Sequence, residues 1–211
     1  MRKTLHYVFD PLCGWCYGAS GTVSAAASAD IDLRLLPSGL FSGPGARPMD
    51  DAFAAYAWAN DQRIERLTGQ PFSELYRTRV LADRHQRFDS GLATLALTAV
   101  ALAAPGRELD VLRAIQQARY VDGRDVTRRE TLVDLLAAKG LAEAGARLHE
   151  PDAALREAND ARVDEARALL QAFDARGVPT FILERNGRRQ RLQTSAAYSD
   201  PQAFLDQFAA A

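Results

Sequence analysis

Two cysteines, Cys13 and Cys16, are the residues of this 211-residue chain whose type and spacing point most clearly to chemistry. Only Gly14 and Trp15 separate them, and the chain has no other cysteine. Two thiols three residues apart on a helix are close enough to form a disulfide. A C-x-x-C sequence beside a strand–helix–strand pattern is typical of a redox dithiol in an intracellular protein. We therefore interpret the pair as a redox-active centre.

The two cysteines are expected to play different roles. Cys13 lies at the predicted start of a helix, where unpaired backbone N–H groups and the helix dipole stabilise a thiolate. Cys16 lies one turn further along, on the apolar face that includes Ala19 and Val23. We predict that Cys13 is the attacking thiol and that Cys16 resolves the mixed disulfide.

Other interpretations of the cysteine pair are weaker. A structural zinc site needs four ligands, and none of the three histidines, His6, His85 and His149, lies at metal-ligand spacing from the pair. We therefore predict no metal site within the chain, although a metal shared across a dimer stays open. Two inert buried thiols stay open as well, but packing gives no reason for the Gly-Trp between them.

A strand–helix–strand unit is expected to position the dithiol. Residues 4–9 form a predicted strand that ends at Asp10, residues 13–29 a helix, and residues 31–36 a second, parallel strand. Gly18 and Gly21 lower the helix propensity, which a close backbone approach to a sheet would explain. Asp10 and Gly14 are assigned to the surroundings of the dithiol. Asp10 either forms the turn or passes a proton to Cys16, and both roles stay open.

The middle of the chain is predicted to be all-helical. A Gly- and Pro-containing linker at 38–48 leads into a block in which every periodic segment up to about residue 175 is helical. Ser73 and Ser90 are predicted N-caps, and Thr127 with Glu130 a capping box for a helix that Gly140 ends. The predicted helices cover residues 49–67, 73–81, 91–104, 108–120, 127–140 and 152–175.

The end of the chain returns to β-structure. Residues 180–184 form a predicted strand, Asn186-Gly187 is a strong hairpin signal, and residues 188–193 form the partner strand before a helix at 201–208. The fold class is therefore α/β with a large all-helical insertion. We predict a discontinuous α/β domain, residues 1–38 and 160–211, interrupted by a helical insertion domain, residues 39–159.

Composition excludes several classes of partner. The formal net charge is −1, so no basic field attracts nucleic acid or anionic lipid. The first ten residues lack the apolar stretch of a signal peptide, and the longest mostly apolar run, 92–104, is too short to span a membrane. We expect a soluble cytoplasmic protein with no nucleic-acid or membrane partner.

A second motif, Gly177-Val178-Pro179-Thr180-Phe181, precedes the predicted hairpin. Together with the C-x-x-C sequence and the order of elements, it resembles the DsbA family of thioredoxin-fold thiol-disulfide oxidoreductases. The run from Asp10 to Gly18 is similar to the cytoplasmic FrnE-like branch, described as predicted protein-disulfide isomerases. The resemblance implies a thioredoxin-like fold, a cis Pro179 packed over the dithiol, and a Val178 backbone that binds an extended substrate peptide. Trp15 is interpreted as a substrate-facing aromatic residue.

The predicted function is thiol-disulfide exchange through a mixed disulfide with protein thiols or disulfides or with glutathione. No cofactor is expected, because the dithiol transfers the electrons, although glutathione can act as co-substrate. The alternative is a glutathione-dependent transferase or isomerase of the kappa or hydroxychromene carboxylate type. Such enzymes typically have serine at the first position, where this chain has Cys13. A third possibility is a redox-regulated binding protein, in which the disulfide only switches the helical block. The direction of electron flow stays open.

Overall fold

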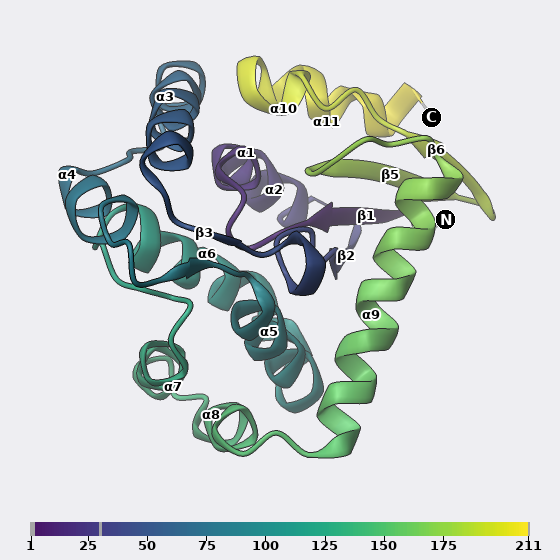
Figure 1. The fold of residues 1–211 in the computed structure, drawn as a ribbon. Coiled ribbons are helices and arrows are strands. Elements are labelled where there is room, and N and C mark those ends of the chain that lie inside the picture. Colours follow the sequence, from purple (N-terminus) through teal and green to yellow (C-terminus); the bar gives the residue numbers. More distant parts are fainter. Residues whose placement is uncertain (1–2, 30, 211) are drawn as a thin grey trace.

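A four-stranded sheet forms the centre of the computed structural model, which describes residues 3–29 and 31–210 (Figure 1). Residues 1, 2, 30 and 211, which our predicted α/β domain includes, lie outside this description. The strand order is β2-β1-β5-β6. Strand β1 (Thr4–Phe9) pairs in parallel with β2 (Asp32–Pro37) and antiparallel with β5 (Thr180–Arg185), which pairs antiparallel with β6 (Arg188–Arg191). The predicted strand–helix–strand unit and hairpin are confirmed.

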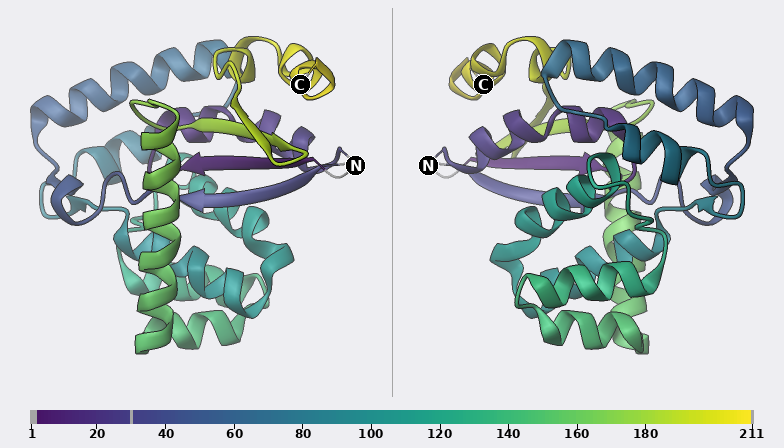
Figure 2. Two further views of the ribbon diagram at one scale, coloured as in Figure 1. Left: turned by 90° about the vertical axis from the view of Figure 1, so that its right-hand side faces the viewer. Right: turned by 90° about the vertical axis from the view of Figure 1, so that its left-hand side faces the viewer.

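Alternating side chains give the sheet two apolar faces. On one face Tyr7 stacks on Phe181, whose ring meets Phe204 of α11 (Pro201–Ala210) edge to face. On the other face Val8 and Ile182 pack against α9 (Ala153–Ala172). Successive residues of a strand point to opposite faces, so each central strand contributes to both cores. Figure 2 shows the sheet and the helices on its two faces in two opposite views, with α9 crossing one end of the sheet.

The predicted helix at 13–29 is two helices. Helix α1 (Gly14–Gly18) and helix α2 (Ser20–Ala27) meet at Ala19, which ends one and begins the other. The reason that we expected for Gly18 and Gly21 is wrong. A Cβ at Gly18 would lie 2.5 Å from the Ile64 side chain of α3 (Asp51–Thr68), so this glycine accommodates a helix rather than a sheet. Gly21 has nothing nearer than 3.7 Å, so no close approach requires it.

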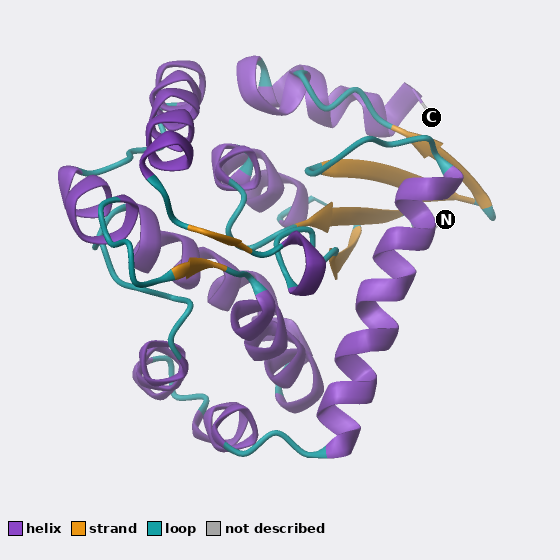
Figure 3. Ribbon diagram, viewed as in Figure 1, coloured by secondary structure: helices purple, strands orange, loops and turns teal. Residues whose placement is uncertain are grey.

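Helices make up most of the regular structure in the middle of the chain (Figure 3). Two short strands, β3 (Arg47–Pro48) and β4 (Arg87–Phe88), pair within it, and neither was predicted. Helix α8 was also missed, because it is short and begins after Gly140, which has a φ of 72°. Besides α3, the helices are α4 (Glu74–Tyr76), the π-helical η2 (Arg77–Leu81), α5 (Gly91–Ala103), α6 (Glu108–Tyr120), α7 (Arg129–Ala138) and α8 (Ala142–His149), with 3-10 turns η1 (Gly43–Gly45) and η3 (Pro105–Arg107).

Of the three predicted capping interactions, the one at Ser73 is confirmed. Ser90 is the N-cap residue of α5, as predicted, but its side chain makes no capping hydrogen bond, and the capping box at Thr127 is wrong. The Ser73 hydroxyl accepts a hydrogen bond from the Tyr76 N–H, as an N-cap should. The Ser90 hydroxyl instead donates to the Asp10 carboxylate at 2.7 Å. The Thr127 hydroxyl donates to Asp125, and α7 begins after Arg128 with no side-chain cap. In both failures a carboxylate outside the helix competes with the backbone for the hydroxyl group.

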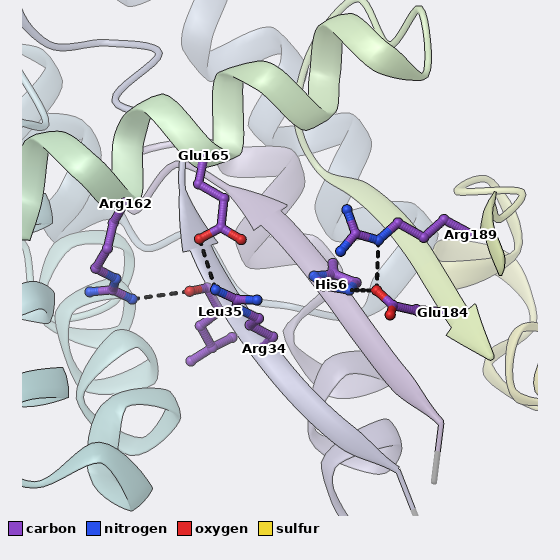
Figure 4. A network of polar contacts seen from close by, with 7 residues as sticks. All are labelled: His6, Arg34, Leu35, Arg162, Glu165, Glu184 and Arg189. Atoms are coloured by element: carbon purple, nitrogen blue, oxygen red, sulfur yellow. Dashed lines mark hydrogen bonds and ion pairs between the residues drawn. The ribbon is translucent and has the colours of Figure 1, made fainter. Parts of the chain in front are cut away.

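Helix α9 connects the helical region to the sheet, running from the helices at the bottom of Figure 1 up to the strands. Arg162 donates to the Leu35 carbonyl on the outer edge of β2 at 3.0 Å, and Glu165 pairs with Arg34 at 2.9 Å (Figure 4). The Arg162 contact occupies one backbone carbonyl of an edge that would otherwise offer unpaired backbone groups. The domain boundary that we place at 159/160 lies inside this continuous helix, and it stays a prediction.

The other edge of the sheet is the hairpin of β5 and β6. Asn186 and Gly187 both have positive φ, 55° and 74°, which is the conformation that a two-residue hairpin turn requires. Arg189 of β6 donates to Glu184, which also lies 3.0 Å from Nε2 of the buried His6 (Figure 4). After β6 the chain returns over the first face of the sheet through α10 (Ala196–Ser199) and α11.

Candidate active site

Cys13 lies in the loop between β1 and α1, as the N-cap residue of α1. Its backbone N–H donates to the Asp10 carbonyl at 3.1 Å, and its φ and ψ of −83° and 117° are extended, as at most N-caps. The residue is only 7% exposed. Its Sγ donates to the Val178 carbonyl at 3.6 Å. The thiol therefore lies at the N-terminus of a helix, but it is more covered than we expected.

Cys16 lies inside α1 and is fully buried. Both cysteines are free thiols. Burial raises the pKa of the Cys16 thiol well above its ordinary value, and the neighbouring Cys13 raises it further. The Tyr7 hydroxyl donates to the Cys16 carbonyl at 3.3 Å and so ties α1 to the central strand. In the dithiol form, Cys16 is thus a protonated thiol beneath Cys13.

The loop before β5 brings the second motif to the dithiol. The Val178–Pro179 peptide bond is cis, the form that the resemblance implies, and the Val178 carbonyl is the group that Cys13 contacts. The Thr180 hydroxyl donates to the Gly177 carbonyl at 2.8 Å and closes the loop. Val8 of β1 is the register partner of Thr180, so the central strand pair places both motifs at one end of the sheet.

Trp15 is partly buried rather than fully exposed. Its ring meets that of Tyr198 edge to face, with 5.0 Å between centroids. The guanidinium of Arg63, on α3, lies 5.7 Å from the Trp15 ring centroid. Burial raises the pKa of the Tyr198 hydroxyl. An aromatic side chain next to a reactive cysteine and beside an arginine offers both apolar area and a positive charge.

Asp10 is a fully buried carboxyl that organises the loops around the dithiol. Its Oδ1 accepts from the Leu12 N–H at 2.9 Å, and its Oδ2 accepts from the Phe41 N–H at 3.1 Å and from the Ser90 hydroxyl at 2.7 Å. Burial raises its pKa, and these hydrogen bonds oppose that shift. The carboxyl forms the turn before Cys13, and it also ties that turn to the 38–48 segment and to α5.

Asp61 of α3 is a second buried acid at the dithiol, and the sequence analysis did not identify it. A Cβ added to Gly14 would lie 2.5 Å from Oδ1 of Asp61, so this carboxyl rests on the backbone that follows Cys13. Its Oδ2 accepts from the Tyr76 hydroxyl at 2.9 Å. Tyr120, next to the buried Arg119, donates to the Leu12 carbonyl at 2.8 Å. No pattern at 61, 76 or 119 marks these residues, because only the fold brings Asp61 to Gly14, and Tyr76 and Arg119 to Asp61.

Comparison with known proteins identifies the family. The model of the DSBA-like thioredoxin domain matches residues 4–208. The chain belongs to this family. It is therefore a thiol-disulfide oxidoreductase with a thioredoxin fold that contains a helical insertion. A search of curated proteins finds no match.

Solved structures in the DSBA-like family resemble the whole chain. The cytosolic disulfide reductase DsbM from Pseudomonas aeruginosa is 39% identical, with a TM-score of 0.87. The match covers 99% of this chain and 100% of the reductase chain. A structure of the same reductase with GSH is 37% identical with a TM-score of 0.81 and the same coverage. DsbA from Pseudomonas aeruginosa, 20% identical with a TM-score of 0.55, covers 98% of this chain and 80% of its own, and it shows the shared fold.

In this DSBA-like chain, the dithiol lies apart from any candidate metal site and from the cavity of the helical region. Among the described residues, no group of three or more histidine, cysteine, aspartate or glutamate side chains is placed to hold a metal ion. A cavity of about 820 Å³ lies on the helical side, lined by residues such as His85, Arg128 and Asn159, and neither cysteine borders it. Within the described parts of the chain, every helix is too short or too polar to span a bilayer.

Proposed function

We propose that this oxidoreductase is a cytoplasmic disulfide reductase that is coupled to glutathione. The observation that supports its chemistry is the position of Cys13, at the start of α1 and 3.6 Å from the Val178 carbonyl, with Cys16 fully buried behind it. The direction of electron flow follows the cytosolic reductase that is 39% identical over 99% of this chain. Glutathione enters the proposal because a structure of that reductase contains GSH.

The Cys13 thiolate attacks one sulfur of a substrate disulfide, forms a mixed disulfide and releases the other sulfur as a thiolate, which takes up a proton. Cys16 then loses its proton and attacks Cys13 Sγ. This step releases the second substrate thiol and leaves the Cys13–Cys16 disulfide. Two glutathione molecules return the enzyme to the dithiol and become one glutathione disulfide. Two electrons thus pass from glutathione to the substrate through the dithiol, and the proposed cycle needs no bound cofactor.

Val178 has a separate role in this proposal. In the dithiol form its carbonyl accepts from Cys13 Sγ. In the mixed disulfide that sulfur has no hydrogen to donate, so the carbonyl becomes free for an N–H of the substrate backbone. Extended peptides bind in this way along exposed backbone groups. Pro179 shapes this loop, and Trp15, beside Arg63 and Tyr198, forms the neighbouring contact for substrate.

The reduction potential of the dithiol in a glutathione buffer tests the proposal. A value near that of thioredoxin, about −270 mV, supports a reductase, whereas a value near about −120 mV identifies an oxidant. Turnover of a protein disulfide with glutathione as the only reductant tests the coupling. The alternative, a glutathione-dependent isomerase or transferase on a small molecule, requires turnover that survives Cys16→Ser. The cavity of about 820 Å³ gives it no support, because neither cysteine borders it.

A further inference from the structure

Helix α3 of the helical region lies directly against the C-x-x-C helix. Gly14 and Gly18 allow this contact, because a Cβ at either position would lie 2.5 Å from a side chain of α3, Asp61 or Ile64. Neither glycine has a positive φ, so space rather than backbone conformation requires them. The Asp61 carboxyl therefore lies against the residue that immediately follows Cys13, at the end of α1 where a thiolate would be stabilised.

The surroundings of Asp61 are unusual for a carboxylate. The residue is 5% exposed, and the hydrogen bond from Tyr76 reaches only Oδ2. Arg119 is fully buried, and its guanidinium lies 5.3–5.7 Å from the ring centroids of Phe88, Tyr76 and Tyr120. Within the described residues none of its three side-chain nitrogens has a hydrogen-bond partner. Its positive charge is therefore stabilised by cation–π contacts with these rings and by nearby negative charge.

Burial decides the protonation of this acid. It raises the pKa of Asp61 to about 7, although the Tyr76 hydrogen bond and the Arg119 charge both lower that pKa. Arg77 pairs with Glu74 on the exposed side of its helix, and Arg63 lies over Trp15. The neighbouring groups that act on the Asp61 charge are Tyr76 and Arg119, and Asp61 in turn raises the pKa of Tyr120. The elements packed around Asp61 also carry Cys13, Cys16, Arg63, Glu65, Arg79 and Tyr198.

We propose that Asp61 and Cys13 share a single negative charge at the start of α1, so that the Cys13 thiolate forms as the Asp61 carboxylate takes up a proton. This inference rests on the proposed role of Cys13 as the attacking thiol. Two neighbouring groups in a poorly solvated site do not both ionise readily, and their titrations are coupled. The exchange conserves charge, because one proton leaves the Cys13 thiol and one joins the Asp61 carboxylate.

The same exchange runs in reverse during catalysis. When the thiolate attacks a substrate disulfide, Cys13 Sγ becomes neutral and the negative charge leaves with the released thiolate. Asp61 is then free to ionise, and its proton neutralises that thiolate through water. Asp61 is thus a positioning residue that acts on the charge of Cys13. The Gly14 of the dipeptide is the residue that allows it to approach.

The test is the pH dependence of iodoacetamide alkylation at Cys13, mapped by mass spectrometry on the reduced full-length protein. For the wild type we expect two inflections. The profile of Asp61→Asn should have one inflection. Cys13 of this variant should be alkylated up to about tenfold faster near neutral pH, because the negative charge that disfavours the Cys13 thiolate is removed. Tyr76→Phe removes a hydrogen bond that favours the ionised Asp61, so its lower inflection should move to higher pH. Asp51→Asn, on the same helix but exposed and paired with Arg84, should match the wild type.

Two outcomes separate this inference from the proposed function. If the Asp61→Asn profile superimposes on that of the wild type while Cys13 still reacts first, the charge sharing is wrong and the function stands. If Cys13 does not react and its loss leaves turnover intact, the proposed function is wrong. Should Asp61→Asn fail to fold, carboxyl NMR of the wild type replaces it. The Asp61 pKa must be higher in the dithiol form than in the disulfide form, and equal values overturn the inference.

Discussion

Asp10 and Asp61 are two buried acids that reach the same dithiol from different parts of the chain. Asp10 follows the central strand β1, and its two oxygens accept hydrogen bonds from the Leu12 and Phe41 N–H groups and from the Ser90 hydroxyl. Asp61 belongs to the helical region, accepts one hydrogen bond on Oδ2, and places Oδ1 against Gly14. These donors to Asp10 lower its pKa and oppose the effect of burial, whereas burial raises the pKa of Asp61, with one bound oxygen, to about 7. The sheet side, which is the four-stranded sheet with the loops that carry Cys13 and Pro179, therefore builds the site. The helical side, which is the helical region with α3, adjusts its charge.

Loss of either cysteine should have the largest effect, and it tests whether the chemistry belongs to the sheet side. Cys13→Ser should reduce disulfide turnover to the uncatalysed background, because no attacking thiolate is left. Cys16→Ser should keep the attack but trap mixed disulfides with protein substrates or glutathione, visible on a non-reducing gel. Full activity in Cys13→Ser would show that the dithiol does not carry the chemistry, and a binding role of the helical region would then replace the proposed function.

Asp10→Ala should cost the most stability of the substitutions at the two acids. It leaves the Leu12 and Phe41 N–H groups and the Ser90 hydroxyl without their acceptor. At about 1–3 kcal/mol for each buried group left unpaired, a loss of about 5 kcal/mol in the free energy of unfolding is expected. Urea denaturation measures it. Asp10→Asn keeps one acceptor oxygen and should lose less, so equal losses in both variants would contradict a structural role for the carboxylate.

The stability of the wild type should fall with rising pH through Asp61. Its folded-state pKa of about 7 lies above the ordinary value of 3.8, so the folded protein binds this proton more tightly than the unfolded chain. The contribution is complete below about pH 4 and is lost as the pH rises to about 7. Relative to Asp61→Asn, the wild type should lose about 1.4 kcal/mol per pH unit in that window, about 4 kcal/mol at most. Denaturation curves at pH 5, 6, 7 and 8 for both proteins measure the difference, and parallel curves would contradict it.

Local patterns in the sequence predicted most of the sheet side. The β1 segment, the Asn186-Gly187 turn and helix α6 lie where the residues indicated, because strand alternation, turn conformation and helical periodicity are properties of neighbouring residues. The site's placement also followed from a local signal, since the C-x-x-C sequence directly follows a strand. The resemblance supplied the cis form of Val178–Pro179, which the residues alone gave no reason to expect.

The helical side was predicted as helices but not as contacts. Gly14 and Asp61 are 47 positions apart, and the buried Arg119 is another 58 positions away, so only tertiary packing brings them together. The two capping errors come from carboxylates that the capping patterns do not include. Ser90 and Thr127 have the sequence of caps, but carboxylates at positions 10 and 125 bind their hydroxyl groups instead. A distant carboxylate at Ser90 and a neighbouring one at Thr127 thus decided what the capping patterns left open.

The smallest expected effects come from two glycines, and they test how closely the two sides fit. Gly14→Ala should destabilise the fold by about 2 kcal/mol, as overpacking of a tight contact does, because the new methyl group would lie 2.5 Å from Asp61 Oδ1 and 3.2 Å from Ile64. The displaced carboxyl should also alter the pH profile of Cys13 alkylation. Gly21→Ala is the matched control, since α2 leaves a Cβ there 3.7 Å from its nearest neighbour. Helix propensity alone should then stabilise it by up to about 1 kcal/mol. Thermal denaturation of both variants gives the comparison. If Gly14→Ala is as stable as Gly21→Ala, Asp61 moves aside freely, and the contact between the dithiol and the helical region cannot fix the charge at Cys13.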